Sequence, residues 1–465
     1  MRLNEYLDSL KGKRVAVIGI GVSNTPLIEL LLGYGVSVTA CDQKERSAFG
    51  DLADRLEKWG CTLKLGKDYL QGLDQDIIFR SPGIRPDIPE FLSAVERGSE
   101  VTSEMEVFLD VCPCHTIAVT GSDGKTTTTT IIAEMLRAAG KTVYIGGNIG
   151  HPLLAEAGKM KEEDYAVLEL SSFQLLTMHK SPEIAVVTNL APNHLNVHKG
   201  MEEYVEAKAN ILRYQSAAQK VILNYDNDLT RAFSQRAPGK TVFFSRLSPD
   251  AGDVFFADGR ISVRNGDCVR PVLSADEIAI PGVHNIENYM AAVAAVDGLV
   301  SDEVIREVAA SFSGVEHRIE LVREVHGVKY YNDSIASSPT RTIAGLRSFR
   351  QKVILIAGGK DKNIDYAPLG PEIVQHVRFL ILTGGDVIGS TVPKICAAVL
   401  NAPEYDSVAL PILLIDDFEE AVRAAAAQAS EGDVVLLSPA STSFDKFSNF
   451  MERGKTFKAV VNHLE

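Results

Sequence analysis

The sequence predicts an α/β protein of three domains. Its length of 465 residues corresponds to about three domains of ordinary size. Short apolar stretches alternate with amphipathic helical stretches along most of the chain, and this alternation is typical of parallel sheets covered by helices. The pattern is interrupted near residues 101–114 and restarts after residue 314. We therefore expect domains at residues 1–103, 104–314 and 315–465.

The first domain begins with an apolar strand that ends in Gly19-Ile20-Gly21 and is followed by a helical stretch. A second strand ends in Asp42, about 20 residues further on, where dinucleotide-binding folds place a ribose contact. This order predicts a Rossmann-like fold, and the alternation after residue 314 predicts another at the C-terminus. Asn24 replaces the third glycine of the dinucleotide fingerprint, which weakens the alternative of a nicotinamide-dependent dehydrogenase.

The strongest motif lies between an apolar strand at residues 116–119 and a helical stretch at 130–139. Glycines let backbone N–H groups approach phosphate oxygens, and the following helix directs its positive end at them. A lysine adds positive charge, and a threonine hydroxyl can bind Mg²⁺. The full Walker pattern fails, because its first glycine position is Val119. We expect a central P-loop ATPase-like domain whose contracted phosphate loop binds ATP through Gly121, Ser122, Asp123, Gly124, Lys125, Thr126 and Thr127.

Composition excludes several classes of protein. The formal net charge of −14 argues against a nucleic-acid partner, because phosphate backbones require clustered Lys and Arg. Of the six Cys, only Cys112 and Cys114 are close in sequence, and no second pair completes a zinc site. The N-terminus has no apolar signal core, and no run of about 18 apolar residues occurs. We expect a cytoplasmic protein without membrane spans.

Further motifs follow the phosphate loop in a fixed order. They read GGNIG at residues 146–150, LELSSFQ at 168–174, YVEAK at 204–208, GVHNIEN at 282–288, EHR at 316–318 and NDS at 332–334. Together with the contracted loop they resemble the Mur ligase family and its folylpolyglutamate synthetase relatives, over nearly the whole chain. The resemblance implies an ATP-dependent amide ligase, in which ATP phosphorylates a carboxylate and an amine attacks the acyl-phosphate.

The resemblance also implies site residues around ATP and Mg²⁺. Lys125, Glu169, His194 and Lys208 would be catalytic, and the metal would be held by Thr126, Glu169, His194 and Lys208, the last as a carbamate. The nucleotide would further contact Asn288, Arg318 and Asp333. Asn193 and Asn196 stand where the family usually has Asp.

The C-terminal motifs are most similar to the family members that add D-glutamate to UDP-N-acetylmuramoyl-L-alanine. The muramyl substrate would contact Val22, Ser23, Asp42, Ser81 and Asn148, and D-glutamate would contact Ser337, Lys362, Ser443 and Phe450. Ile335 stands where some of these members have Lys, and Arg341 is a candidate to supply the missing charge.

Three alternatives stay open at this point. The chain could be another Mur ligase or a folylpolyglutamate synthetase-type ligase, a dehydrogenase, or a nucleotide-binding regulator without catalytic activity. The expected assembly is a monomer that takes small-molecule substrates.

Overall fold

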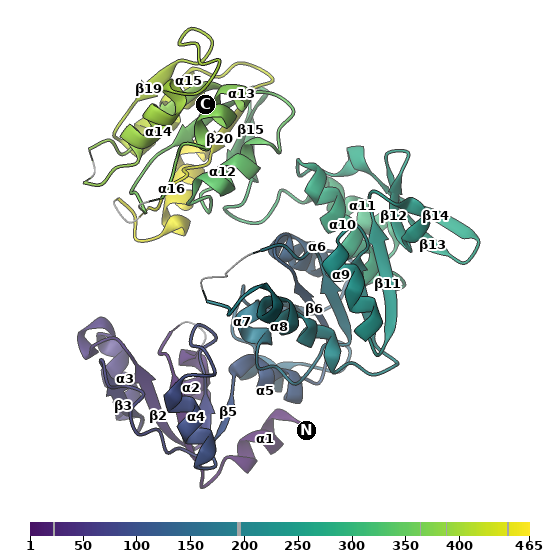
Figure 1. Cartoon of the computed structure of the whole chain (residues 1–465), viewed down its shortest axis with the longest axis vertical. Coiled ribbons are helices and arrows are strands. Elements are labelled where there is room, and N and C mark those ends of the chain that lie inside the picture. Colours follow the sequence, from purple (N-terminus) through teal and green to yellow (C-terminus); the bar gives the residue numbers. More distant parts are fainter. Residues whose placement is uncertain (22–23, 193–196, 363, 387, 444–445) are drawn as a thin grey trace. The chain divides into compact units, whose positions relative to one another are not determined.

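The computed structural model describes residues 1–21, 24–192, 197–362, 364–386, 388–443 and 446–465. The chain forms two compact units, one of residues 1–275 with 287–308 and the other of residues 276–286 with 309–465. Three largely parallel sheets carry the fold (Figure 1), which confirms the predicted α/β class. They lie within the three predicted domain ranges, and the domain boundaries themselves stay a prediction.

The first sheet has five parallel strands in the order β3-β2-β1-β4-β5. The central strand β1 is apolar and buried because helices cover a parallel sheet on both faces. The strands are β1 (Arg14–Ile18), β2 (Ser37–Asp42), β3 (Thr62–Leu65), β4 (Ile77–Phe79) and β5 (Glu100–Thr102); the helices are α1 (Leu3–Ser9), α2 (Thr25–Gly33), η1 (Arg46–Ala48), α3 (Asp51–Lys58) and α4 (Pro89–Glu96).

The second sheet has nine strands in the order β14-β13-β12-β11-β10-β9-β6-β8-β7, and β12 to β14 are antiparallel. Its strands are β6 (His115–Thr120), β7 (Val143–Gly147), β8 (Tyr165–Glu169), β9 (Ile184–Val187), β10 (Lys220–Asn224), β11 (Lys240–Ser245), β12 (Val254–Ala257), β13 (Arg260–Asn265) and β14 (Cys268–Ser274). Its helices are α5 (Glu104–Val111), α6 (Lys125–Ala138), η2 (Leu154–Lys159), α7 (Ser172–Leu175), α8 (Met201–Arg213), α9 (Asp228–Ala232), η3 (Phe233–Arg236), η4 (Pro249–Ala251), η5 (Ala275–Glu277), α10 (Val283–Val296) and α11 (Asp302–Ser311).

The first two sheets share a hydrophobic core. Val17 of the first sheet, Phe108 of α5 and Leu168 of the second sheet belong to one cluster of buried side chains. This shared core explains why the first unit contains both sheets.

The third sheet has six strands in the order β15-β16-β20-β17-β18-β19. Its strands at 353–357, 377–382, 412–414 and 434–437 agree with the apolar alternation predicted after residue 314, whereas the antiparallel hairpin β15–β16 was not predicted. The strands are β15 (Glu320–Val325), β16 (Val328–Asn332), β17 (Val353–Ala357), β18 (Val377–Leu382), β19 (Ile412–Leu414) and β20 (Val434–Leu437); the helices are α12 (Pro339–Leu346), α13 (Leu369–His376), α14 (Val392–Leu400), α15 (Phe418–Ala427) and α16 (Phe450–Asn462).

Within the described ranges, none of the helices combines the length and the apolar character that crossing a membrane requires.

Candidate active site

The phosphate loop joins the buried strand β6 to helix α6. Gly124 has φ +77°, in the left-handed region, and a Cβ on it would collide with the Asn288 amide oxygen. Gly121 has φ +150°, and a Cβ there would collide with the Thr188 hydroxyl. Both positions therefore require glycine. The loop leaves backbone N–H groups at the N-terminus of α6, which is a suitable site for phosphate.

Helix α8 and the segment after β9 hold this loop in shape. The Ser122 hydroxyl lies 2.8 Å from the Tyr204 hydroxyl and donates to the Ala191 carbonyl. Asn189 accepts a 2.9 Å hydrogen bond from the Asp123 backbone N–H. These contacts fix the loop before any phosphate binds, so little ordering is needed on binding.

Lys125 opens α6 and its ammonium group lies over the loop. Nζ donates to the carbonyl oxygens of Gly121 and Ser122, at 3.0 Å each. The predicted phosphate-binding lysine therefore has its charge at the loop, as the sequence motif requires. Thr126 follows it in the first turn and is half-buried.

Glu169 and Asn148 come from separate motifs and meet at the ends of β8 and β7. Only 1% of Glu169 is exposed, and its Oε1 accepts a 2.7 Å hydrogen bond from the Asn148 amide. Its Oε2 is buried and has no hydrogen-bond partner among the described residues. An ionised carboxylate oxygen without a partner is costly to bury.

That oxygen fits a hard divalent cation. Mg²⁺ prefers carboxylate oxygens and usually binds through one or two of them together with substrate phosphates and water. Among the described residues, no group of three or more His, Cys, Asp or Glu side chains is arranged to hold a metal ion, so the fit rests on Glu169 beside the phosphate loop. Cys112 and Cys114 are free thiols with their Sγ atoms 3.3 Å apart.

Lys208 lies on α8 and is 1% exposed. Its Nζ donates to the Thr120 hydroxyl at 3.0 Å and to the Gly121 carbonyl at 2.9 Å. Burial, and then the positive charge of Lys125, lower the pKa of Lys208 well below its ordinary value, while Glu169 opposes the shift. A lysine in a helical stretch is ordinarily exposed, and the structure shows that Lys208 is instead buried at the loop.

Asn288 lies on α10 and faces the start of α6. Its amide oxygen accepts a 3.2 Å hydrogen bond from the Thr128 hydroxyl, and it is the group that excludes a Cβ from Gly124. The predicted nucleotide contact is therefore next to the phosphate loop.

Asp42 has a structural role at the glycine turn after β1. Its two carboxylate oxygens accept backbone N–H groups from Ile20 at 2.7 Å and Lys44 at 2.9 Å. The buried Asn24, which breaks the dinucleotide fingerprint, donates to the carbonyl oxygens of Ile18 and Gly19 at 3.0 Å each. The turn is thus held by polar side chains where a third glycine would have allowed close packing.

Ser81 begins the loop after β4 and packs against Gly19, since a Cβ on that glycine would lie 3.2 Å from the Ser81 Cβ. The structure therefore brings this predicted substrate residue to the glycine turn. Val22, Ser23 and His194, which the sequence also predicted as site residues, lie outside the described residues.

In the second unit, Asp333 is buried at the end of β16. Its carboxylate accepts a 2.8 Å hydrogen bond from the Ser438 hydroxyl, and burial raises its pKa to about 7. The positive charge of Arg318 acts against this shift. The sequence placed both residues at the nucleotide, and the structure places them close enough to interact electrostatically.

The predicted amino-acid residues also gather in this unit. The Lys362 ammonium donates to the Ser337 hydroxyl at 3.1 Å. Burial and the charges of Arg341 and Arg453 lower the pKa of Lys362. Arg341 donates from its guanidinium to the backbone carbonyl of Ile335 at the start of the same loop. Its role in place of a lysine stays a prediction.

Ser443 and Phe450 complete the predicted set. Ser443 is 3% exposed, and its carbonyl accepts the Phe447 backbone N–H at 2.9 Å. Phe450 opens α16, and its ring lies 6.1 Å from that of His317 in an edge-to-face arrangement. Its carbonyl accepts a 2.8 Å hydrogen bond from the Ser334 hydroxyl.

Sequence reasoning missed two supporting residues, Thr188 and Arg453. Thr188 donates to the Asp123 carbonyl at 2.6 Å; its place directly after β9, beside β6, was a usable signal. Arg453 is 3% exposed and donates to Ser334 and to the Ser441 carbonyl. Its position inside a C-terminal helix gave no signal for such a role.

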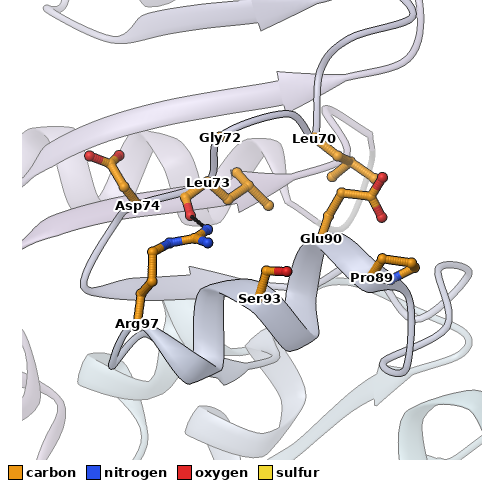
Figure 2. A pocket seen from close by; sticks show the side chains of 8 residues that line it. All are labelled: Leu70, Gly72, Leu73, Asp74, Pro89, Glu90, Ser93 and Arg97. Atoms are coloured by element: carbon orange, nitrogen blue, oxygen red, sulfur yellow. Dashed lines mark hydrogen bonds between the residues drawn. The ribbon is translucent and has the colours of Figure 1, made fainter.

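One surface pocket of about 340 Å³ lies away from these groups (Figure 2). Arg97 crosses it and donates to the Leu73 carbonyl at 2.7 Å, and Asp74 and Glu90 lie on its rim. No predicted site residue lines it, so it is separate from the candidate active site.

Comparison with known proteins agrees with this geometry. The Mur ligase middle domain matches residues 119–296, and the Mur ligase glutamate ligase domain matches residues 317–441. The UDP-N-acetylmuramoylalanine–D-glutamate ligase of Acetivibrio thermocellus is 53% identical over 467 residues, which cover 100% of this chain and 99% of the relative. The enzyme of the same name from Ruminiclostridium cellulolyticum is 50% identical, with the same coverage.

Solved structures show the same fold. The UDP-N-acetylmuramate-alanine ligase of Thermotoga maritima superposes with a TM-score of 0.58 at 18% identity, covering 97% of this chain and 99% of that one. Because the middle and glutamate ligase domains of this family both match the chain, and because two relatives are similar along their full length, the chain belongs to the Mur ligase family.

Proposed function

We propose that this protein joins D-glutamate to UDP-N-acetylmuramoyl-L-alanine, with ATP converted to ADP and phosphate. The reaction is a ligation through an acyl-phosphate in peptidoglycan synthesis. The relatives at 53% and 50% identity carry this activity in their names, and their similarity extends over the complete chain.

One observation carries the proposal. The phosphate loop, the unpartnered Glu169 oxygen and the buried Lys208 gather at the carboxyl ends of adjacent strands β6 and β8. In open α/β sheets this edge is where ligands bind. A triphosphate placed on the loop would have its charge facing the Glu169 carboxylate, which would hold the metal, and the ammonium group of Lys125.

The protein's own groups supply binding and electrostatic stabilisation. Loop N–H groups and the N-terminus of α6 hold the phosphates, and Lys125 neutralises charge as the γ-phosphoryl group moves to the substrate carboxylate. The muramyl substrate is expected at Asn148 and at Ser81 beside the glycine turn. No protein nucleophile is required, because the carboxylate of the muramyl substrate attacks the γ-phosphorus.

Glu169 with Thr126 would hold Mg²⁺, which would supply positive charge to offset the negative charge of the phosphates. We further propose that the Lys208 amine takes up CO₂ as a carbamate. A carbamate needs an uncharged amine, and burial next to Lys125 favours that form. The product would place an anionic oxygen where the structure has a buried amine.

The second unit would bind D-glutamate. A dicarboxylic amino acid requires cations and hydroxyl donors held together. Lys362 with Ser337 provides one such pair, and Arg341 adds a second cation nearby. After binding, the D-glutamate amine attacks the acyl-phosphate carbon, and phosphate leaves.

Phosphate release and product mass test the proposal. The purified protein is given ATP, Mg²⁺ and UDP-N-acetylmuramoyl-L-alanine with D-glutamate, L-glutamate, L-lysine or diaminopimelate in separate reactions. We expect phosphate release and a new amide only with D-glutamate. Release with L-lysine or diaminopimelate alone would assign the chain to another branch of the family.

Location and assembly belong to the same proposal. A cytoplasmic site is where ATP and nucleotide-linked precursors are available, and the net charge of −14 is unfavourable for binding nucleic acid. A monomer is expected, and light scattering during gel filtration measures it directly.

A further inference from the structure

The guanidinium of Arg85 ties the loop after β4 to helix α8. Its Nε and Nη2 donate to the two oxygens of Asp87 at 2.8 and 3.1 Å. Its Nη1 and Nη2 donate to the two oxygens of Glu203 at 2.9 and 2.8 Å. Nη1 also donates to the Val197 carbonyl at 2.7 Å. All five N–H donors of the side chain are therefore used.

Both carboxylates have further partners. Glu203 also accepts the Lys199 backbone N–H at 2.8 Å, and Asp87 pairs with the Lys199 ammonium group. The hydrogen bonds from Arg85 are the main cause that lowers the pKa of Glu203 to about 2. The Arg85 and Glu203 side chains are each 23% exposed, so the pair is more protected than an ordinary surface salt bridge.

The contacts continue from Glu203 into the candidate active site through His198. The imidazole Nδ1 lies 3.2 Å from Glu203, and Nε2 lies 2.9 Å from the Ser172 hydroxyl. A carboxylate only accepts, so Nδ1 carries the proton and Nε2 accepts from Ser172. The His198 side chain is fully buried and stacks on Phe173, with ring centroids 5.2 Å apart.

The two ends of this network are functional elements of the proposed enzyme. At one end, the Arg85 loop begins at Ser81, the predicted substrate residue beside the glycine turn. At the other, Ser172 follows Glu169 by three positions, and Glu203 precedes Tyr204, whose hydroxyl meets Ser122 in the phosphate loop. The residues of this network are spread over the chain from position 85 to position 203.

We propose that Arg85 and Glu203 are positioning residues that fix the muramyl-substrate loop against the helix bearing Lys208, and so set the substrate carboxylate relative to the γ-phosphate. The inference rests on the proposed function, because it assigns the loop after β4 to the muramyl substrate. Small displacements of a reacting group are costly in a reaction that depends on alignment. A bidentate pair is suited to this task because a planar fork fixes direction as well as distance.

A double-mutant cycle tests the pair. The variants Arg85→Ala, Glu203→Gln and the combination are compared with wild type by steady-state kinetics, with each of the three substrates varied in turn. We expect each single change to reduce kcat/KM for the muramyl substrate at least tenfold, with KM for ATP within about twofold of wild type. The kcat/KM of the double variant should be no lower than that of the less active single variant, because both changes remove the same interaction.

Arg236→Ala is the matched control. Arg236 forms a bidentate pair with Glu206 on the same helix as Glu203, at 2.6 and 2.7 Å, and that pair lies on the surface. Its loss should leave all three KM values and kcat unchanged. Arg85→Lys keeps the charge without the fork and should recover less than a tenth of the lost activity.

The outcomes separate the two proposals. A wild-type protein inactive with D-glutamate contradicts the proposed function. If the wild type is active, three results contradict the positioning role alone. The losses of kcat/KM in the two single variants could multiply in the double variant, or KM for ATP could change as much as KM for the muramyl substrate. Arg236→Ala could also lose as much activity as the Arg85 and Glu203 variants. Thermal unfolding of each variant identifies a general loss of folding. Glutamine is used at position 203 because it keeps the shape of the buried contact with His198, which alanine would remove.

Discussion

The Asn148 amide donates a 2.7 Å hydrogen bond to one oxygen of Glu169, and the other oxygen of that carboxylate has no hydrogen-bond partner in the described part of the chain. The hydrogen bond fixes the direction of the carboxylate. The remaining oxygen is thereby held beside the phosphate loop, where we propose that it binds Mg²⁺.

Glu169→Gln keeps this shape and removes the negative charge. We expect kcat to fall by about 10²–10³, on the order of 3–4 kcal/mol of transition-state stabilisation, and the Mg²⁺ concentration for half-maximal activity to rise. A titration of activity against Mg²⁺ measures both. Asn148→Ala keeps the charge of the Glu169 carboxylate but no longer fixes its direction, so it should lower kcat less than Glu169→Gln does. An equal dependence of activity on Mg²⁺ in wild type and in Glu169→Gln would exclude metal binding at Glu169.

Gly124→Ala tests whether the phosphate loop requires its backbone shape. The added Cβ would strain a left-handed residue and collide with Asn288, so we expect ATP binding to be lost in calorimetry. Gly140 has the same φ of +77°, and nothing lies within 4 Å of the place that an added Cβ would take. Gly140→Ala should therefore cost about 1–2 kcal/mol of stability and leave ATP binding intact.

Lys208 carries the proposed carbamate. In protein kept under ¹³C-labelled bicarbonate, we expect a carbamate carbon signal that is absent from Lys208→Arg. Removal of CO₂ should lower the activity of wild type reversibly, and Lys208→Ala should be inactive at any bicarbonate concentration. Full activity in CO₂-free buffer would contradict the modification while leaving the reaction itself untouched.

Glu104 should make the stability of the first unit depend on pH. Burial raises its pKa to about 7, although its Oε1 accepts the Leu154 backbone N–H at 2.8 Å. The folded state holds the proton more tightly than the unfolded state, so the contribution is fully present below about pH 4.5 and is lost as pH rises through 7. The change amounts to at most about 3 kcal/mol.

Glu104→Gln removes this titration and keeps the acceptor oxygen. Calorimetric unfolding at pH 5 and pH 8 should show a smaller decline for the variant than for wild type. The titration of Asp333 is common to both proteins and cancels in the comparison. An identical decline in both would mean that Glu104 ionises in the folded state as it does in the unfolded one.

Local motifs were sufficient to predict the parts of the site that depend on backbone shape. The spacing of Gly121, Gly124 and Lys125 between a strand and a helix predicted the phosphate loop. Glycines that expose the backbone and a lysine at a helix N-terminus together indicate phosphate binding. The apolar strands of the third sheet were predicted for a similar reason. The hairpin β15–β16 was not, since its residues alternate weakly and its pairing partners are set by the fold.

Contacts between distant segments could not be predicted. Nothing near Arg85 in sequence indicates a partner at Glu203, and nothing near Asp42 indicates that its oxygens hold the glycine turn. Lys208 shows the same limit, because its burial depends on strands that are about 90 positions away. A single sequence contains propensities and spacing, whereas these contacts depend on how sheets pack.

The ammonium of Lys125 rests on the carbonyl oxygens of its own loop. An arriving nucleotide must exchange those internal contacts for phosphate oxygens, so the net gain is smaller than the phosphate contact alone. When the diphosphate leaves, the lysine has partners to return to, and the emptied loop is not left with an unscreened cation. The affinity of the loop for ADP is therefore lower than it would be if the Lys125 ammonium had no internal partners, and this favours release of the product.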